Sequence, residues 1–195
     1  MLYTSFAQLR EADACQSRYR HLRSVLSKDV YRDETPIPLV EILDANGLDD
    51  ALWSLRVCGE DVVSFIREYA LRCAVHVGHI GGEDARACNA VTRRYLDGEA
   101  TCEELVLAKA AWERAMVAWK TKPLWEQLAC WAADAAAAPW AADAERASYA
   151  AGASDVMQCG VSWATDAAAG AGEDAEVAWQ TDTLRKMLVA EAAED

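Results

Sequence analysis

The sequence predicts an all-α protein, either an irregular helical bundle or a set of stacked antiparallel helical hairpins, with roughly eight to ten helices. Apolar side chains recur at intervals of three and four residues over most of the chain, and strand-like alternation is nearly absent. Proline and glycine interrupt this pattern at short intervals, so we expect short links between the helices. Hydrophobic residues make up 53% of the chain, which is enough for a sizeable core.

The N-terminal part predicts a small unit of two helices. Residues 4–28 indicate a short helix followed by a longer one. Residues 29–38 interrupt the helical pattern, because their two prolines favour extended backbone. We therefore expect a small helical head over residues 1–35 and a helical body over residues 36–195. One continuous domain is the alternative.

The next segment predicts three helices with distinct boundaries. A helix over residues 39–45 is expected to stop at Gly47, because glycine readily adopts left-handed backbone. A short helix capped by Asp49 or Asp50 follows. Residues 60–80 carry the clearest amphipathic pattern of the chain, with apolar side chains at helical spacing and charges between them.

Helices continue to the end of the chain. One is expected over residues 83–96, and Thr101 with Glu104 forms a capping box for another over residues 102–120. The part that follows is rich in alanine with widely spaced tryptophans. Its last helix is expected over residues 174–192.

The formal net charge of −13 is unevenly distributed. Residues 1–122 contain 16 basic and 19 acidic side chains, whereas residues 123–195 contain 3 basic and 13 acidic ones. Such an acidic C-terminal part repels phosphate backbones and anionic membranes, so neither nucleic acid nor a membrane is expected as a direct partner. It would attract a protein with a basic surface, such as a nucleic-acid-binding complex. The simpler interpretation is that the charge only keeps the protein in solution.

The candidate protein-binding residues are carboxylates in this acidic part, several of them spaced by close to three helical turns. They are Asp134, Asp143, Glu145, Asp155, Asp166, Glu173, Asp174 and Glu176. Breaks at Pro139, Gly152 and Gly160 prevent one straight helix. A continuous row of carboxylates that resembles a phosphate backbone is therefore only a hypothesis.

The cluster of metal-capable side chains in the sequence is Cys73, His76, His79 and Cys88. Helical spacing places His76 near both Cys73 and His79, and the glycines at 81 and 82 allow Cys88 to return across a hairpin. The spacing matches no established zinc motif, and Cys73 also falls in the apolar stripe of its helix. We therefore expect buried cysteines, with no metal ion and no cofactor.

No catalytic residue is predicted, and the protein is expected not to be an enzyme. The sequence has no phosphate-binding loop, no dinucleotide-binding glycine motif and no zinc-protease motif. The chain begins with polar sequence, so we expect no export signal. No apolar run approaches the ~20 residues of a membrane span, so we expect no transmembrane helix. The seven scattered cysteines agree with a cytoplasmic location, which is the host cytoplasm if a phage encodes the protein.

Four segments resemble proteins that phages and prophages encode. They are FAQLREADAC at 6–15, ILDANGLDDALWSLR at 42–56, YLDGEATCEEL at 95–105 and AWQTDTL at 178–184. Similar segments occur in Ala/Trp-rich helical proteins, mostly of unknown function, some of which are similar to immunity protein families. The resemblance implies a mobile-element origin and a helical fold, and it supplies no catalytic residue.

These observations favour a non-enzymatic accessory protein that binds and inhibits a host protein. A nucleic-acid-handling defence complex would suit the acidic part, which would act as a nucleic-acid mimic in the manner of an anti-CRISPR protein. One alternative is a structural or assembly protein that forms homo-oligomers through its alanine and tryptophan faces. Another is an immunity protein that neutralises a basic toxin.

Overall fold

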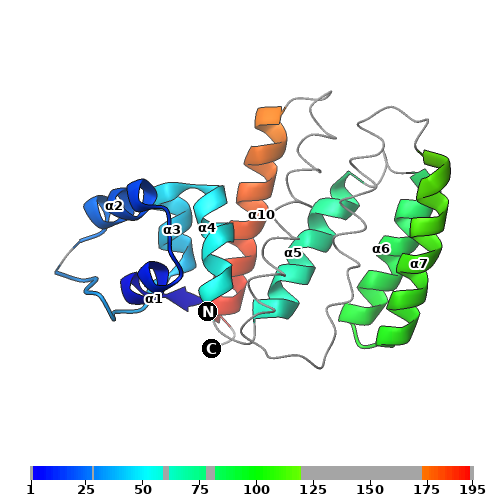
Figure 1. Ribbon diagram of the computed structural model, residues 1–195, viewed down its shortest axis with the longest axis horizontal. Helices are drawn as coiled ribbons and strands as arrows, with labels where there is room; N and C mark the ends of the chain where they lie inside the picture. The colour runs from blue at the N-terminus through cyan, green and yellow to red at the C-terminus, as the bar shows by residue number, and fades with distance from the viewer. Residues whose placement is uncertain (1, 28, 59–61, 78–81, 120–172, 194–195) are drawn as a thin grey trace.

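The computed structural model describes residues 2–27, 29–58, 62–77, 82–119 and 173–193. These residues hold eight α-helices, one short 3-10 helix and one two-stranded sheet (Figure 1). The predicted all-α fold class is therefore confirmed. The alanine- and tryptophan-rich segment from 120 to 172 lies outside the described residues.

The chain begins with a strand and two helices. Strand β1 (Tyr3–Thr4) precedes α1 (Phe6–Glu11), and α2 (Gln16–Val25) follows. Ser5 caps α1, because its hydroxyl accepts a hydrogen bond from the backbone N–H of the third helical residue, Gln8. β1 pairs antiparallel with β2 (Ile37–Pro38). The sequence did not predict this pairing, because a two-residue strand is too short to show alternation.

An N-terminal core cluster joins α1 and α2 to α3 (Leu39–Asn46). Its buried members are Phe6, Leu9, Leu22, Leu26, Ile37 and Ile42. The Phe6 and Tyr19 rings form an edge-to-face pair, with ring centroids 5.6 Å apart. The two N-terminal helices therefore pack on α3, and the division into head and body stays a prediction.

A glycine separates the next two helices. Gly47 has a φ of 87° and a ψ of −175°, a backbone conformation that is essentially restricted to glycine. The predicted helix stop at this position is confirmed. The helix α4 (Leu48–Ser54) begins directly after it, so Asp49 and Asp50 lie in its first turn rather than at its cap. The 3-10 helix η1 (Leu55–Val57) continues α4.

The remaining helices lie beside one another in a row (Figure 1). α5 (Val62–His76) contacts α6 (Gly82–Leu96), which forms a hairpin with α7 (Cys102–Trp119). On its other side α5 contacts α10 (Glu173–Ala193), which also contacts α3 and α4. The C-terminal helix is thus inserted between the N-terminal helices and α5.

The main core lies around α10 and α5. Leu184, Met187 and Leu188 of α10 are buried in one cluster with Ile66 and Leu71 of α5. The cluster also includes residues of α3, α4, η1 and α6. Because α10 packs on both of its sides, its apolar side chains do not form one narrow stripe. This burial is the dominant stabilising contribution to the position of α10.

The capping box at the start of α7 is confirmed. The N–H of Thr101 donates to the Glu104 carboxylate at 2.8 Å, and the N–H of Glu104 donates to the Thr101 hydroxyl at 3.2 Å. Leu105 and Trp112 of α7 pack with Cys88 of α6 in a third, smaller cluster. None of the described helices is both long and apolar enough to cross a lipid bilayer.

Candidate functional site

The structure places the predicted acidic residues in three groups. Five of them lie outside the described residues, namely Asp134, Asp143, Glu145, Asp155 and Asp166. Glu173 and Asp174 form the first turn of α10, and their side chains are not among those described. Glu176 is only 4% exposed, so it does not belong to an exposed acidic surface. The expectation that Glu176 contacts a partner is therefore corrected.

Glu176 instead joins α10 to the end of α5. Its carboxylate lies 3.1 Å from Nε2 of His76 and accepts a hydrogen bond of 2.9 Å from the Gln180 side chain. The His76 ring stacks on Trp179, with ring centroids 3.8 Å apart and an interplanar angle of 10°. A buried carboxylate is stable only when such partners satisfy it. His76 is therefore fixed between a carboxylate and an indole face.

The four metal-capable residues of the sequence are not brought together as a described cluster. Cys73 is buried in the main core, whereas Cys88 is buried in the cluster between α6 and α7. His79 lies outside the described residues. Among the residues that are described, no group of three or more His, Cys, Asp or Glu side chains is arranged to hold a metal ion.

Burial also raises the pKa of two of the cysteines, Cys73 and Cys58. Cys73 is 1% exposed, and the loss of solvent raises the pKa of its thiol to about 12. The same effect raises the pKa of Cys58 to about 12. Because the thiolate is the nucleophilic form, little of the nucleophile is present on either side chain at neutral pH.

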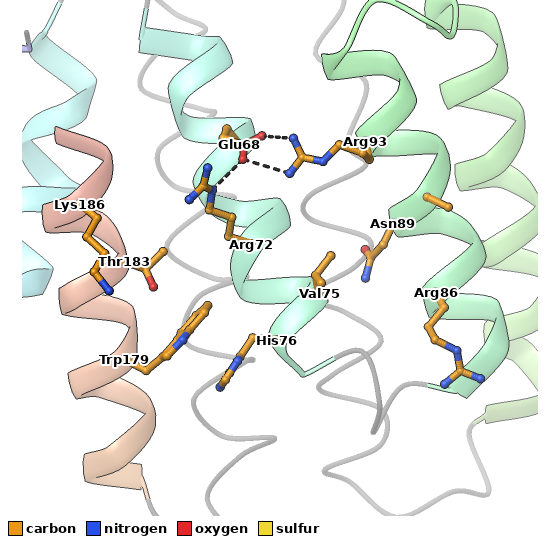
Figure 2. Close-up of a pocket in the computed structure, with 11 residues that line it drawn as sticks. Glu68, Arg72, Val75, His76, Arg86, Asn89, Arg93, Trp179, Thr183 and Lys186 are labelled. Carbon is orange, nitrogen blue, oxygen red and sulfur yellow. Dashed lines mark hydrogen bonds and ion pairs between the residues drawn. The ribbon is translucent and has the colours of Figure 1, made fainter. Parts of the chain in front are cut away.

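A groove of about 1070 Å³ lies between α5, α6 and α10 (Figure 2). We call it the basic groove, since its described lining contains four basic side chains and one carboxylate: Arg72, Arg86, Arg93, Lys186 and Glu68. This lining has three more positive than negative groups, in a protein whose net charge is −13. Its volume is similar to the ~300–1,000 Å³ of typical small-molecule sites.

Glu68 organises the arginines of the basic groove. Its carboxylate accepts hydrogen bonds from Arg93 at 2.6 and 3.0 Å and from Nε of Arg72 at 2.7 Å. Burial opposes ionisation of Glu68, but the bonds from Arg93 and Arg72 outweigh burial and hold its pKa below the ordinary value. Figure 2 shows both guanidinium groups converging on this carboxylate. One carboxylate therefore orients two cations and neutralises one of them.

The other lining residues bring two further kinds of surface. Asn89 of α6 is 4% exposed, and its Oδ1 has no hydrogen-bond partner in the part of the chain that the structure describes. Val75 of α5 is 56% exposed, and with His76 and Trp179 it gives the groove an apolar portion. Thr183 of α10 also lines the groove. The site combines charge, hydrogen-bonding capacity and apolar area.

Sequence reasoning did not identify the basic groove, although part of its signal is local. Arg86, Asn89 and Arg93 are spaced by three and four residues and so share one face of α6. Helical periodicity alone could have placed them together. Their position opposite Lys186 depends on the packing of α10 beside α5, which joins segments about a hundred residues apart and has no local pattern.

Known proteins give no further guide to this site. The relationship to phage-encoded proteins rests on the four sequence segments and stays a prediction. Comparison of the chain with protein-family models, with curated proteins and with solved structures found no match.

Proposed function

We propose that this protein is a non-enzymatic accessory protein of a phage or another mobile element, which binds a basic surface of a host protein and inhibits it. A nucleic-acid-handling defence complex is the proposed type of partner. One observation carries the proposal: residues 123–195 contain 13 acidic side chains and only 3 basic ones. This segment cannot neutralise its own charge.

The ion pairs of the described residues strengthen this argument. Of the three basic residues in the acidic part, Arg185 pairs with Asp44 of α3 and Lys186 pairs with Asp182 at 2.6 Å. Arg185 is thus used on a carboxylate outside its own segment. The remaining base, Arg146, lies outside the described residues. The acidic side chains of the segment therefore outnumber its basic ones by ten, 13 against 3.

The N-terminal part differs in this respect. Several of its carboxylates form ion pairs within the chain, among them Asp33 with Arg10 and Arg23, and Asp50 with Arg18. Internal pairing lowers the field that such a surface projects into solvent. The C-terminal part is thus the better candidate for attracting a basic partner.

Inhibition would follow from competition for the same cations. Lysine and arginine side chains that bind nucleic-acid phosphates can bind carboxylates instead, and the net charge of the inhibitor speeds the encounter. Association of this kind weakens as salt screens the charges, with a Debye length of about 10 Å at 0.1 M ionic strength. Salt sensitivity is therefore the expected signature.

Affinity capture from a nuclease-treated host lysate, at low and at high salt, tests the proposal. We expect a nucleic-acid-binding protein that is retained at low salt and released at high salt. A bait in which Asp155, Asp166, Glu173 and Asp174 are changed to their amides is expected to lose this protein. The matched control removes four charges from exposed carboxylates of the N-terminal part, namely Glu11, Asp29, Glu34 and Glu99.

Two outcomes would reject the proposal. Recovery of the bait alone as a salt-resistant oligomer would indicate a structural protein. Equal capture of the partner by both neutralised baits would show that the acidic part does not mediate binding. Capture of a basic toxin would support binding through the acidic part, but it would indicate an immunity protein instead of an inhibitor of host defence.

A further inference from the structure

The described lining of the basic groove has a net charge opposite in sign to that of the protein. Four basic side chains from three helices surround it, and the carboxylate within it already binds Arg72 and Arg93. Clefts lined by one sign of charge concentrate the field and raise the local concentration of counter-ions. A small anion is therefore the kind of ligand that this surface attracts.

Arg86 is a groove cation that is available to a ligand. Its side chain is exposed on α6, and within the described residues it forms no ion pair. Lys186, from the opposite side of the groove, pairs with the exposed Asp182 and with no other carboxylate of the described residues, and its own side chain is 74% exposed. Exposed pairs of this kind contribute little free energy and exchange readily for a stronger partner.

Asn89 is a buried polar residue of the groove wall. Its side chain is almost fully buried in the groove wall, and its Oδ1 lacks a hydrogen-bond partner among the described residues. Figure 2 shows this side chain directed from α6 toward α5, across the groove. An unsatisfied buried amide costs stability and is uncommon in folded proteins.

We propose that the basic groove is a binding site for a small organic phosphate. Guanidinium groups match phosphate geometry because they donate two parallel hydrogen bonds, and Glu68 pre-orients two of them. Arg86 and Lys186 supply further charge, and Val75 with Trp179 supplies an apolar surface for the organic part. Long nucleic acids are excluded by repulsion from the protein's net charge of −13, whereas a small ligand experiences mainly the local field.

Isothermal titration calorimetry on the full chain tests this site with four probes: inorganic phosphate, pyrophosphate, adenosine 5′-monophosphate and adenosine. We expect the monophosphate to bind, inorganic phosphate to bind more weakly, and adenosine not to bind. Arg86→Gln and Lys186→Gln should each weaken binding about tenfold, as expected for loss of one charge-assisted contact. Arg20→Gln, which removes an exposed arginine of α2 outside the groove, should leave affinity unchanged.

The proposal is overturned if no phosphate probe binds the folded protein at millimolar concentration. It is also overturned if Arg20→Gln weakens binding as much as Arg86→Gln, since binding would then be non-specific. Circular dichroism of each variant checks that folding is intact; the exposed position of Arg86 makes loss of folding unexpected. This titration is independent of the lysate capture that tests the proposed function, because Arg86→Gln and Lys186→Gln alter no carboxylate of the acidic part.

Discussion

The imidazole of His76 stacks on the indole of Trp179, with 3.8 Å between ring centroids. His76 is the last residue of α5, and Trp179 lies in the second turn of α10. The contact joins two helices that are far apart in sequence and forms one end of the basic groove. It is thus a structural element of the fold and part of the candidate site.

Trp179→Ala should destabilise the protein by about 1–3 kcal/mol, because it removes an aromatic stack together with partly buried apolar area. Urea unfolding followed by circular dichroism measures this change in the free energy of unfolding. Val189→Ala on the same helix is the control, since Val189 is 56% exposed. Equal losses for the two variants would show that the stack does not hold α10 in place.

Glu176→Ala should destabilise the protein by about 1–3 kcal/mol, because it removes the buried carboxylate that contacts the His76 and Gln180 side chains. Asp182→Asn removes a carboxylate of the same helix from an exposed pair with Lys186, so it should cost less than about 1 kcal/mol. Chemical denaturation of both variants gives the comparison. A neutral effect of Glu176→Ala would indicate that Glu176 faces solvent.

Glu68 should make stability depend on pH in the acid range. The pKa of Glu68 in the folded state is lower than the unfolded-state value near 4.5. The contribution of Glu68 to the free energy of unfolding is therefore fully present above pH 4.5, and it is lost as the pH falls through the folded-state pKa. The wild type should be more stable than Glu68→Gln at pH 7, and the difference should shrink at pH 3. Urea unfolding at the two pH values measures it. A difference that is constant between them would contradict the ion pairs with Arg93 and Arg72.

Gly47→Ala should cost about 1–3 kcal/mol through backbone strain alone. The φ of 87° and ψ of −175° at this position are unfavourable for any residue with a Cβ. A Cβ placed there would meet no atom within 4 Å, so no steric clash contributes. Thermal unfolding measures the loss. An unchanged melting temperature would mean that α3 and α4 are joined by an ordinary turn.

The cysteines should differ in their rate of reaction with a thiol reagent. Cys15 is exposed, and hydrogen bonds from Ser17 and from the backbone of Arg18 and Ser17 lower its pKa, so more thiolate is present at neutral pH. Cys15→Ser should remove a fast phase of labelling, whereas Cys73→Ser should not. A fast phase that persists in Cys15→Ser would contradict this assignment.

Much of the fold follows from local sequence chemistry. The apolar spacing of residues 60–80 predicts α5, and Thr101 with Glu104 predicts the start of α7. Gly47 predicts the break between α3 and α4. These features depend on side-chain spacing or on one residue's backbone preference, and both are visible in sequence.

The remaining features depend on tertiary contacts. Nothing in the spacing of α10 indicates that it lies between α3 and α5, because its two buried sides give no single apolar stripe. The burial of Glu176 follows from that position, so charge counting assigned it wrongly to an exposed surface. The basic groove combines three helices, so local spacing could indicate only its α6 face.

The most direct test of the proposed function is the salt dependence of binding to a captured partner. The dissociation constant would be measured between about 50 and 300 mM salt, where the Debye length falls markedly. It would be compared for the wild type, the variant neutralised at Asp155, Asp166, Glu173 and Asp174, and the N-terminal control variant. We predict a steep salt dependence for the wild type and the control, and weaker, flatter binding for the first variant. Three parallel curves of equal affinity would contradict binding through the acidic C-terminal part.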